Sequence, residues 1–250
     1  MAGHSKWANI KHRKAAVDKK RGKIWSKKAH AIIVAARLGG GDPNANNRLA
    51  DAVADARSVN MPANNIDRAI KRGTGELAGA DPEELFYEGY ASGGVAVIVE
   101  ALTDNRKRTA PEVKHIFDKH GGNLGQTGSV MHSFDRKGII ALEKDSAPSE
   151  EELFELVVEA GAEDLEGDDE GFTITTPATE LENVKKALAA KEIPTISAEL
   201  EFVPHTRMEV DEDTARKVQK LVDALEESND VQNVYTNHEP PESVIAEMNQ

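Results

Sequence analysis

The chain has 250 residues, 39% of them hydrophobic and 30% charged, which is enough material for more than one hydrophobic core. It contains no cysteine, and this excludes a disulfide framework, a thiolate zinc site and a cysteine nucleophile. The longest unbroken run of strong hydrophobes, residues 95–99, is far shorter than the roughly 18 residues that a membrane-spanning helix needs. The basic N-terminus lacks the apolar segment of a secretory signal, so we expect a soluble cytoplasmic protein.

Charge is distributed very unevenly along the chain. Residues 1–75 carry 16 Lys and Arg against 5 Asp and Glu, a net of +11, whereas the remaining residues carry 15 against 39, a net of −24. A basic segment on a chain of net charge −13 is typical of a protein that binds a polyanion through one end.

The first 78 residues predict a basic N-terminal domain of three helices. Residues 1–16 have no clear apolar period, and we interpret them as an arm that an anionic partner orders. Apolar spacing predicts a helix from Asp18 to Leu38 and a second helix with a stripe from Leu49 to Val59. Pro62 fits the first turn of a third helix, which ends at Gly73.

Beyond a turn-rich boundary at residues 73–82, strands alternate with helices. We expect a strand at 94–102, a helix at 109–120, a strand at 129–134 and a turn at 135–138. Next come a strand (139–143), a helix (149–160), strands at 162–165 and 172–175, a helix (179–190) and a strand (195–203), which is the ferredoxin-like split βαβ order. A strand near 207–210, a helix at 213–227 and a strand at 231–236 complete the prediction.

The predicted fold class is therefore α+β with three domains. An N-terminal three-helix domain (1–78) precedes two ferredoxin-like α/β domains, one inserted into the other. The inserted domain covers 137–203, and the discontinuous domain covers 79–136 and 204–250.

The sequence contains no convincing enzyme motif. It lacks the P-loop and nucleophile-elbow patterns, and the G-x-G-x-x-A match at 73–78 follows a helix rather than a strand, so we interpret it as a linker. The eight histidines do not cluster, and the acidic runs at 150–152 and 168–170 lack the ligand spacing of a calcium loop. We expect no enzymatic activity, no metal, no cofactor and no small-molecule substrate.

The basic residues of the first 28 positions are the candidate nucleic-acid contacts, because such a cluster can replace the counterions around phosphates without reading sequence. Trp7 has polar and basic neighbours and is the better candidate for stacking on a base, whereas Trp25 belongs to an apolar stripe and is expected in the core. A solvated basic face or a membrane-surface helix is the alternative interpretation. The candidate contacts are Lys6, Trp7, Lys11, His12, Arg13, Lys14, Lys19, Lys20, Arg21, Lys23, Lys27 and Lys28.

Two glycine-rich loops and one basic turn are candidate secondary contacts. Glycine lets backbone N–H groups approach an anion closely, although residues 39–41 equally fit a helix C-cap, and either Asn105 or Thr109 fits a helix N-cap. The residues concerned are Gly40, Gly41, Asn105, Arg106, Arg108, Asn123 and Gly125.

A series of ordered motifs resembles the YebC family. The series opens with MAGHSKWAN at Met1–Asn9 and continues through His12-Arg13-Lys14, Lys20-Arg21-Gly22-Lys23, LGGGDP at 38–43, YEGY at 87–90, TDNR at 103–106, GGNLG at 121–125, AGAED at 160–164 and VQNVY at 231–235. The resemblance covers essentially the whole chain. It implies a helical N-terminal domain followed by two α/β domains.

The resemblance also implies a role in gene expression. The family has long been labelled as DNA-binding transcriptional regulators, and it also includes ribosome-associated translation factors that help difficult nascent chains such as proline runs. A mitochondrial translational activator for a cytochrome oxidase subunit belongs to it as well. The match begins at Met1 with no presequence before it, so a bacterial cytoplasmic member is expected.

Two functions compete for the basic segment, and we favour a ribosome-binding translation factor that contacts ribosomal RNA. The alternative is a DNA-binding transcriptional regulator, and an enzyme with an unrecognised site is a distant third. Lysine-rich helices suit phosphates, whereas readers of base edges in DNA usually present Arg, Asn or Gln. No membrane partner is expected, and the oligomeric state is left open with a monomer as the default.

Overall fold

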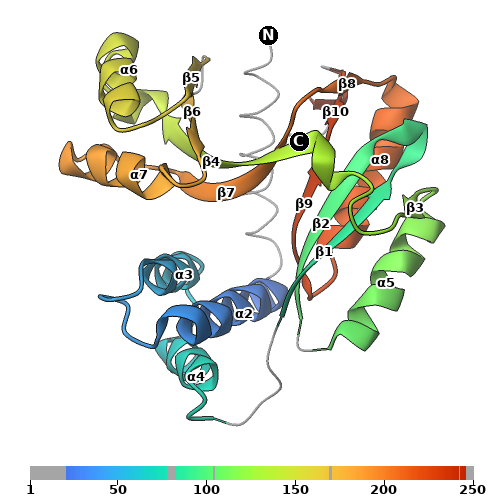
Figure 1. Ribbon diagram of the computed structural model, residues 1–250, viewed down its shortest axis with the longest axis horizontal. Coiled ribbons are helices and arrows are strands. Elements are labelled where there is room, and N and C mark those ends of the chain that lie inside the picture. Colours follow the sequence, from blue (N-terminus) through green and yellow to red (C-terminus); the bar gives the residue numbers. More distant parts are fainter. Residues whose placement is uncertain (1–20, 78–82, 104, 169–170, 242, 246–250) are drawn as a thin grey trace. The chain divides into compact units, whose positions relative to one another are not determined.

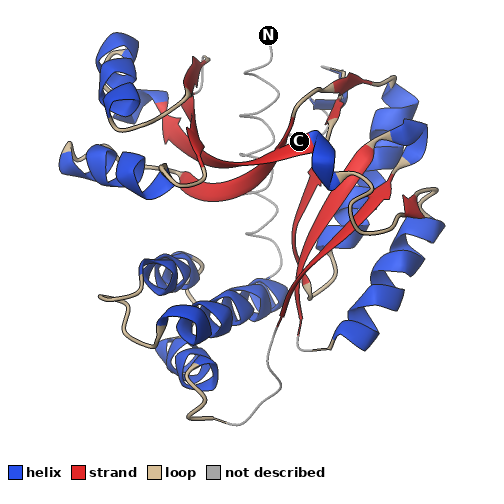
Figure 2. Ribbon diagram, viewed as in Figure 1, coloured by secondary structure: helices blue, strands red, loops and turns tan. Residues whose placement is uncertain are grey.

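The computed structural model describes residues 21–77, 83–103, 105–168, 171–241 and 243–245, except for the side chains of residues 21–23 (Figure 1). Helices come first and sheets follow, which confirms the predicted α+β class (Figure 2). Two compact units divide the described part of the chain. One comprises residues 21–130 with 216–234, and the other comprises residues 131–215 with 235–245.

Three helices form the first described segment, as predicted. They are α2 (Arg21–Gly39), α3 (Asn47–Ser58) and α4 (Ala63–Gly73). Ile32, Leu49 and Ile66 pack into their shared core. The half-buried Trp25 packs against this core, and its indole N–H donates to the Val59 carbonyl at 3.1 Å, so its expected core position is confirmed.

A four-stranded sheet in the same unit has the order β3-β1-β2-β9. Its strands are β1 (Glu83–Tyr90), β2 (Ala96–Thr103), β3 (Asn123–Leu124) and β9 (Val231–Thr236), and β1 is antiparallel to both β2 and β3. Two helices connect to its strands: α5 (Arg106–Lys119) lies between β2 and β3 in sequence, and α8 (Glu212–Glu226) precedes β9. Nearly every residue of β2 is buried, which explains its continuous apolar sequence.

One predicted strand is wrong, and another lies outside this sheet. Residues 129–134 contain a 3₁₀ turn (Met131–Ser133), and the segment predicted at 207–210 forms β8 (Met208–Glu209), which pairs in parallel with β10 (His238–Glu239) instead of joining the sheet. The sheet instead contains β1, a strand that was not predicted from the sequence. Its sequence, EELFYEGY, hides the strand because it mixes carboxylates and a glycine with its apolar residues.

The second large sheet has the predicted ferredoxin-like order, β5-β6-β4-β7, with all neighbours antiparallel. Its elements follow the chain as β4 (Phe134–Glu143), α6 (Glu150–Glu159), β5 (Asp164–Gly167), β6 (Gly171–Pro177), α7 (Leu181–Ala190) and β7 (Ser197–Pro204). Ile140, Leu153 and Leu188 are fully buried in the core between this sheet and its two helices.

The turn predicted at 135–138 is not present, because β4 runs without interruption from Phe134 to Glu143. Gly138 resembles a turn residue but serves close packing. A Cβ atom at this position would lie 2.3 Å from Thr176 Oγ1 and 2.9 Å from Leu181 Cβ. Glycine is therefore required where α7 and β6 approach the middle of the strand.

Candidate nucleic-acid interface

Most of the predicted nucleic-acid contacts lie outside the described residues. These are Lys6, Trp7, Lys11, His12, Arg13, Lys14, Lys19 and Lys20. Arg21 and Lys23 belong to the first turns of α2, but their side chains are also outside the described part. The structure therefore describes side chains for only the last two members of the predicted set, Lys27 and Lys28.

Lys27 and Lys28 both make contacts within the protein. The Lys27 ammonium donates to the Glu226 carbonyl at 3.0 Å, and the Lys28 ammonium forms an ion pair with Asp55 at 3.0 Å. These contacts join α2 to α8 and to α3. An ammonium has three donors, so a protein contact and a phosphate contact are chemically compatible.

The three N-terminal helices share an electrostatic feature that the motif search did not select. Each carries a basic residue in its last turn, namely Arg37 in α2, Arg57 in α3 and both Lys71 and Arg72 in α4. None has an acidic residue in its first turn. The terminal cations offset the negative helix ends, while the described first turns place no carboxylate at the positive ends. Such helices favour an anionic partner.

The glycines after α2 act as a helix end. Gly40 has a φ of +86°, and its N–H donates to the Ala36 carbonyl at 2.9 Å. The buried Asn46 side chain donates to the carbonyls of Ala35 and Gly40 and accepts the Leu49 N–H, so one amide closes α2 and begins α3. Of the two interpretations of these glycines, the geometry supports the C-cap.

The second glycine-rich loop does present N–H groups to an anion, but the anion belongs to the protein. Glu88, only 2% exposed, accepts the N–H of Gly128 at 2.6 Å and that of Val130 at 2.8 Å. The Gly125 N–H donates to the Glu88 carbonyl at 2.7 Å. A phosphate contact through the Gly125 amide would have to break that bond. Asn123, the other predicted contact of this loop, is exposed. It lies in β3, where it pairs with Tyr90 of β1.

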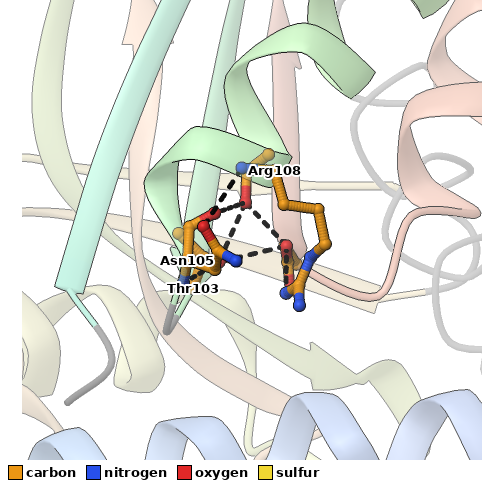
Figure 3. A network of polar contacts seen from close by, with 5 residues as sticks. Thr103, Asn105 and Arg108 are labelled. Atoms are coloured by element: carbon orange, nitrogen blue, oxygen red, sulfur yellow. Dashed lines mark hydrogen bonds and ion pairs between the residues drawn. The ribbon is translucent and has the colours of Figure 1, made fainter. Parts of the chain in front are cut away.

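The basic turn before α5 is part of a buried polar network (Figure 3). Asn105 is the N-cap and accepts the Arg108 N–H at 3.2 Å. The Arg108 guanidinium lies 2.8 Å from the Asp230 carboxylate, which also accepts the hydroxyls of Thr103 at 3.1 Å and Thr109 at 2.6 Å. Two of the predicted secondary contacts, Asn105 and Arg108, are therefore exposed residues that already make hydrogen bonds within the protein.

Asp230 remains a carboxylate at this buried position. Burial alone would raise the pKa of Asp230, but hydrogen bonds from Thr109, Arg108 and Thr103 outweigh it and hold that pKa below the usual value of 3.8. Arg106, also a predicted contact, is exposed on α5. It lowers the pKa of the neighbouring Tyr87, although burial of the phenol has the larger, opposite effect, and the net shift is upward.

The described residues contain neither a cluster of metal ligands nor a membrane-spanning helix. Within them, no three His, Cys, Asp or Glu side chains gather closely enough to hold a metal ion. None of the described helices combines the length and the apolar character needed to cross a membrane.

Two family models match consecutive parts of the chain. The model described as the TACO1/YebC protein N-terminal domain matches residues 5–76, and the model described as the TACO1/YebC second and third domain matches residues 82–238. The chain belongs to the TACO1/YebC family. The resemblance inferred from the sequence motifs is thereby confirmed.

Relatives with known sequences or structures extend this assignment over the whole chain. A protein of Chloroherpeton thalassium named "Probable transcriptional regulatory protein" is 53% identical over all of both chains. One of Treponema pallidum with the same name is 52% identical over 98% of this chain and all of the relative. The crystal structure of a conserved hypothetical protein from Aquifex aeolicus is 50% identical, with a TM-score of 0.82 over 90% of this chain and 93% of its own.

Proposed function

We propose that this TACO1/YebC family member is a nucleic-acid-binding regulator of gene expression that acts without catalysis. The observation that carries the proposal is the net charge of +11 in residues 1–75 on a chain that is otherwise strongly acidic. The names of its relatives support a role in regulation. We further propose that residues 1–78 form the binding domain, and that the segments 79–136 with 204–250 and the insert 137–203 form the other two domains.

Ribosomal RNA is the proposed target, and the protein is proposed to assist translation of difficult sequences such as proline runs. Many phosphates converge on the surface of a large folded RNA, and a lysine-rich segment contacts them without reading bases. A DNA reader would instead present Arg, Asn or Gln to the base edges. The first basic cluster, residues 1–28, contains eight lysines and two arginines and supports the first mode.

The composition of one face of the ferredoxin-like sheet supports an accessory role for the acidic domains that follow residue 78. Ile140 faces the helices, so its neighbour Ile139 belongs to the opposite face of the sheet. The register pairs Ile139 with Thr175 on one side and with Glu199 on the other, and pairs Lys137 with Glu201. This face carries carboxylates instead of the aromatic side chains that stack on RNA bases.

Co-sedimentation with purified ribosomes at moderate salt, with excess random DNA duplex as competitor, tests the proposal. Binding that survives the duplex supports a ribosome-directed factor, since affinity for DNA then follows only from charge. If the excess duplex abolishes ribosome binding, the ribosomal target is rejected. The transcriptional alternative, which the names of the relatives favour, then becomes the leading proposal. Absence of binding to both would reject the nucleic-acid proposal itself.

A further inference from the structure

Helix α6 carries more apolar side chains than its core requires. Leu153 and Val157 are fully buried against the ferredoxin-like sheet, and they account for its inward stripe. Phe154 and Val158 nevertheless lie outside this stripe, with 49% and 44% of their surface exposed. They are one helical turn apart, so they lie side by side. Among the described residues of the unit 131–215 with 235–245, no other large hydrophobic side chain is as exposed as these two.

Carboxylates surround this exposed pair. All five glutamates of α6 are exposed, and the helix contains no lysine or arginine; the glutamates are Glu150, Glu151, Glu152, Glu155 and Glu159. Ser149 caps the helix by accepting the Glu152 N–H, and acidic side chains in the first turn favour the helix N-terminus. Those effects explain the first three glutamates. Glu155 and Glu159 lie beyond that turn and flank the apolar pair.

We propose that the exposed face of α6 (Phe154, Val158, Glu155 and Glu159) binds a lysine- or arginine-rich polypeptide segment of another protein. Such a segment inserts an apolar side chain between Phe154 and Val158 and directs its cations to the flanking glutamates. Apolar anchors supply most of the affinity of such contacts, and opposite charge supplies specificity and a fast encounter.

Charge decides between the occupants that an apolar helix face can take. Nucleic acids and anionic membranes would be repelled by five glutamates on one short helix. A second copy docking through the same face would bring two such sets together, which like-charge repulsion opposes. A basic polypeptide satisfies both the apolar pair and the carboxylates. This binding is separate from the proposed nucleic-acid binding and does not depend on it.

The test uses the full chain and a short fluorescein-labelled peptide of lysines and leucines, with its leucines on one helical face. We expect anisotropy titrations to show binding that weakens with salt. F154S/V158S and the charge reversal E155K/E159K should each weaken it by about tenfold or more. The charge reversal leaves the apolar pair intact, so it keeps the test valid if the serine variant folds poorly. A peptide with serine in place of leucine should bind more weakly.

Matched variants elsewhere provide the controls. L77S removes another exposed hydrophobic side chain, and E143K/E209K reverses two exposed carboxylates on other elements. Equal peptide affinity in every variant would overturn the proposal. Self-association of the wild type that F154S/V158S abolishes, seen by sedimentation, would assign the face to a second copy. Stronger competition by a peptide of residues 1–20 than by the lysine–leucine peptide would assign it to the chain's own N-terminus.

Discussion

One guanidinium nitrogen of Arg108, Nη2, lies 2.8 Å from each carboxylate oxygen of Asp230. The two residues are 122 positions apart, and the whole ferredoxin-like insert lies between them in sequence. The Asp230 carbonyl also accepts the Leu102 N–H at 2.7 Å. Side chain and backbone of Asp230 therefore join the chain segment before the insert to the segment after it. This junction allows a discontinuous sheet to form from both.

Replacement of Asp230 by alanine should destabilise the protein by about 2–4 kcal/mol, because the buried Thr103 hydroxyl and Arg108 lose their acceptor, while Thr109 loses its shortest hydrogen bond. Arg108→Ala should cost less, since the arginine side chain is half exposed and Thr103 and Thr109 still satisfy the carboxylate. Urea unfolding monitored by circular dichroism measures both. Equal costs for the two variants would contradict this ranking, and E209Q, an exposed carboxylate, provides the neutral control.

Glu88→Gln should loosen the glycine-rich loop while leaving the rest of the sheet intact. The carboxylate accepts these two N–H groups on different oxygens, and glutamine has an NH2 donor in place of one of them, so in the same orientation either the Gly128 or the Val130 N–H would face a donor. We expect a loss of about 1–3 kcal/mol of stability. Amide hydrogen exchange should accelerate at Gly128 and Val130 first. Unchanged exchange there, or equal acceleration in E143Q, would show that the carboxylate does not hold the loop.

His238 should make the protein less stable as the pH falls from about 6.5 to about 4. In the folded state, burial lowers the pKa of His238 to about 4, and the positive charge of Arg207 contributes to this shift. The unfolded chain, with an ordinary pKa of 6.5, therefore takes up the proton first, and protonation favours unfolding in this interval. The loss approaches about 3 kcal/mol at the lower end. Urea titrations at pH 7 and pH 5 measure the loss in the free energy of unfolding between these pH values. His238→Gln should reduce this loss, and an equal loss in the wild type and the variant would contradict the assignment.

The parts of the fold that sequence predicted are those with an uninterrupted period. The stripe from Leu49 through Val53 defined α3, and the apolar run of β2 defined a buried strand. The failures occurred where long-range packing overrides local preference. Gly138 has the local signature of a turn but lies in β4, paired with β6 and β7, and it is glycine because Thr176 and Leu181 leave no room for a side chain. Glu88 in β1 has the signature of an exposed residue, yet the loop amides compensate its burial.

The candidate site was predicted from composition, and composition could not show which polar groups the fold itself uses. Asn105 was one of two residues predicted as a possible helix N-cap, and the structure shows that it is the cap, but the bond from Arg108 to Asp230 depends on a partner more than a hundred residues away. Asp230 lies in a Ser-Asn-Asp turn that has the local signature of a solvated loop. Only the tertiary arrangement of β2, α5 and β9 brings these residues together.

The basic segment itself gives the last prediction. Simultaneous replacement of Lys19, Lys20, Arg21 and Lys23 by alanine should abolish binding to ribosomes and to duplex nucleic acid at physiological salt, with no change in the circular dichroism spectrum. Each lost phosphate contact also lowers the salt dependence, so at salt concentrations low enough for the variant still to bind, the slope of log affinity against log salt should fall by about 2–4. Titrations of a duplex RNA measure that slope.

A variant with the same change in net charge separates local contacts from the overall field of the protein. K114A/K119A/K186A/K191A removes four exposed lysines outside the basic segment and outside α8, the helix that Lys27 contacts. Because distant exposed charges are screened within about 8–10 Å near physiological salt, this variant should keep most of the affinity and the full slope. Equal losses in both quadruple variants would mean that net charge, and not the N-terminal segment, attracts the nucleic acid. Alanine also favours a helix at the start of α2, so loss of binding in the first variant would not reflect a broken helix.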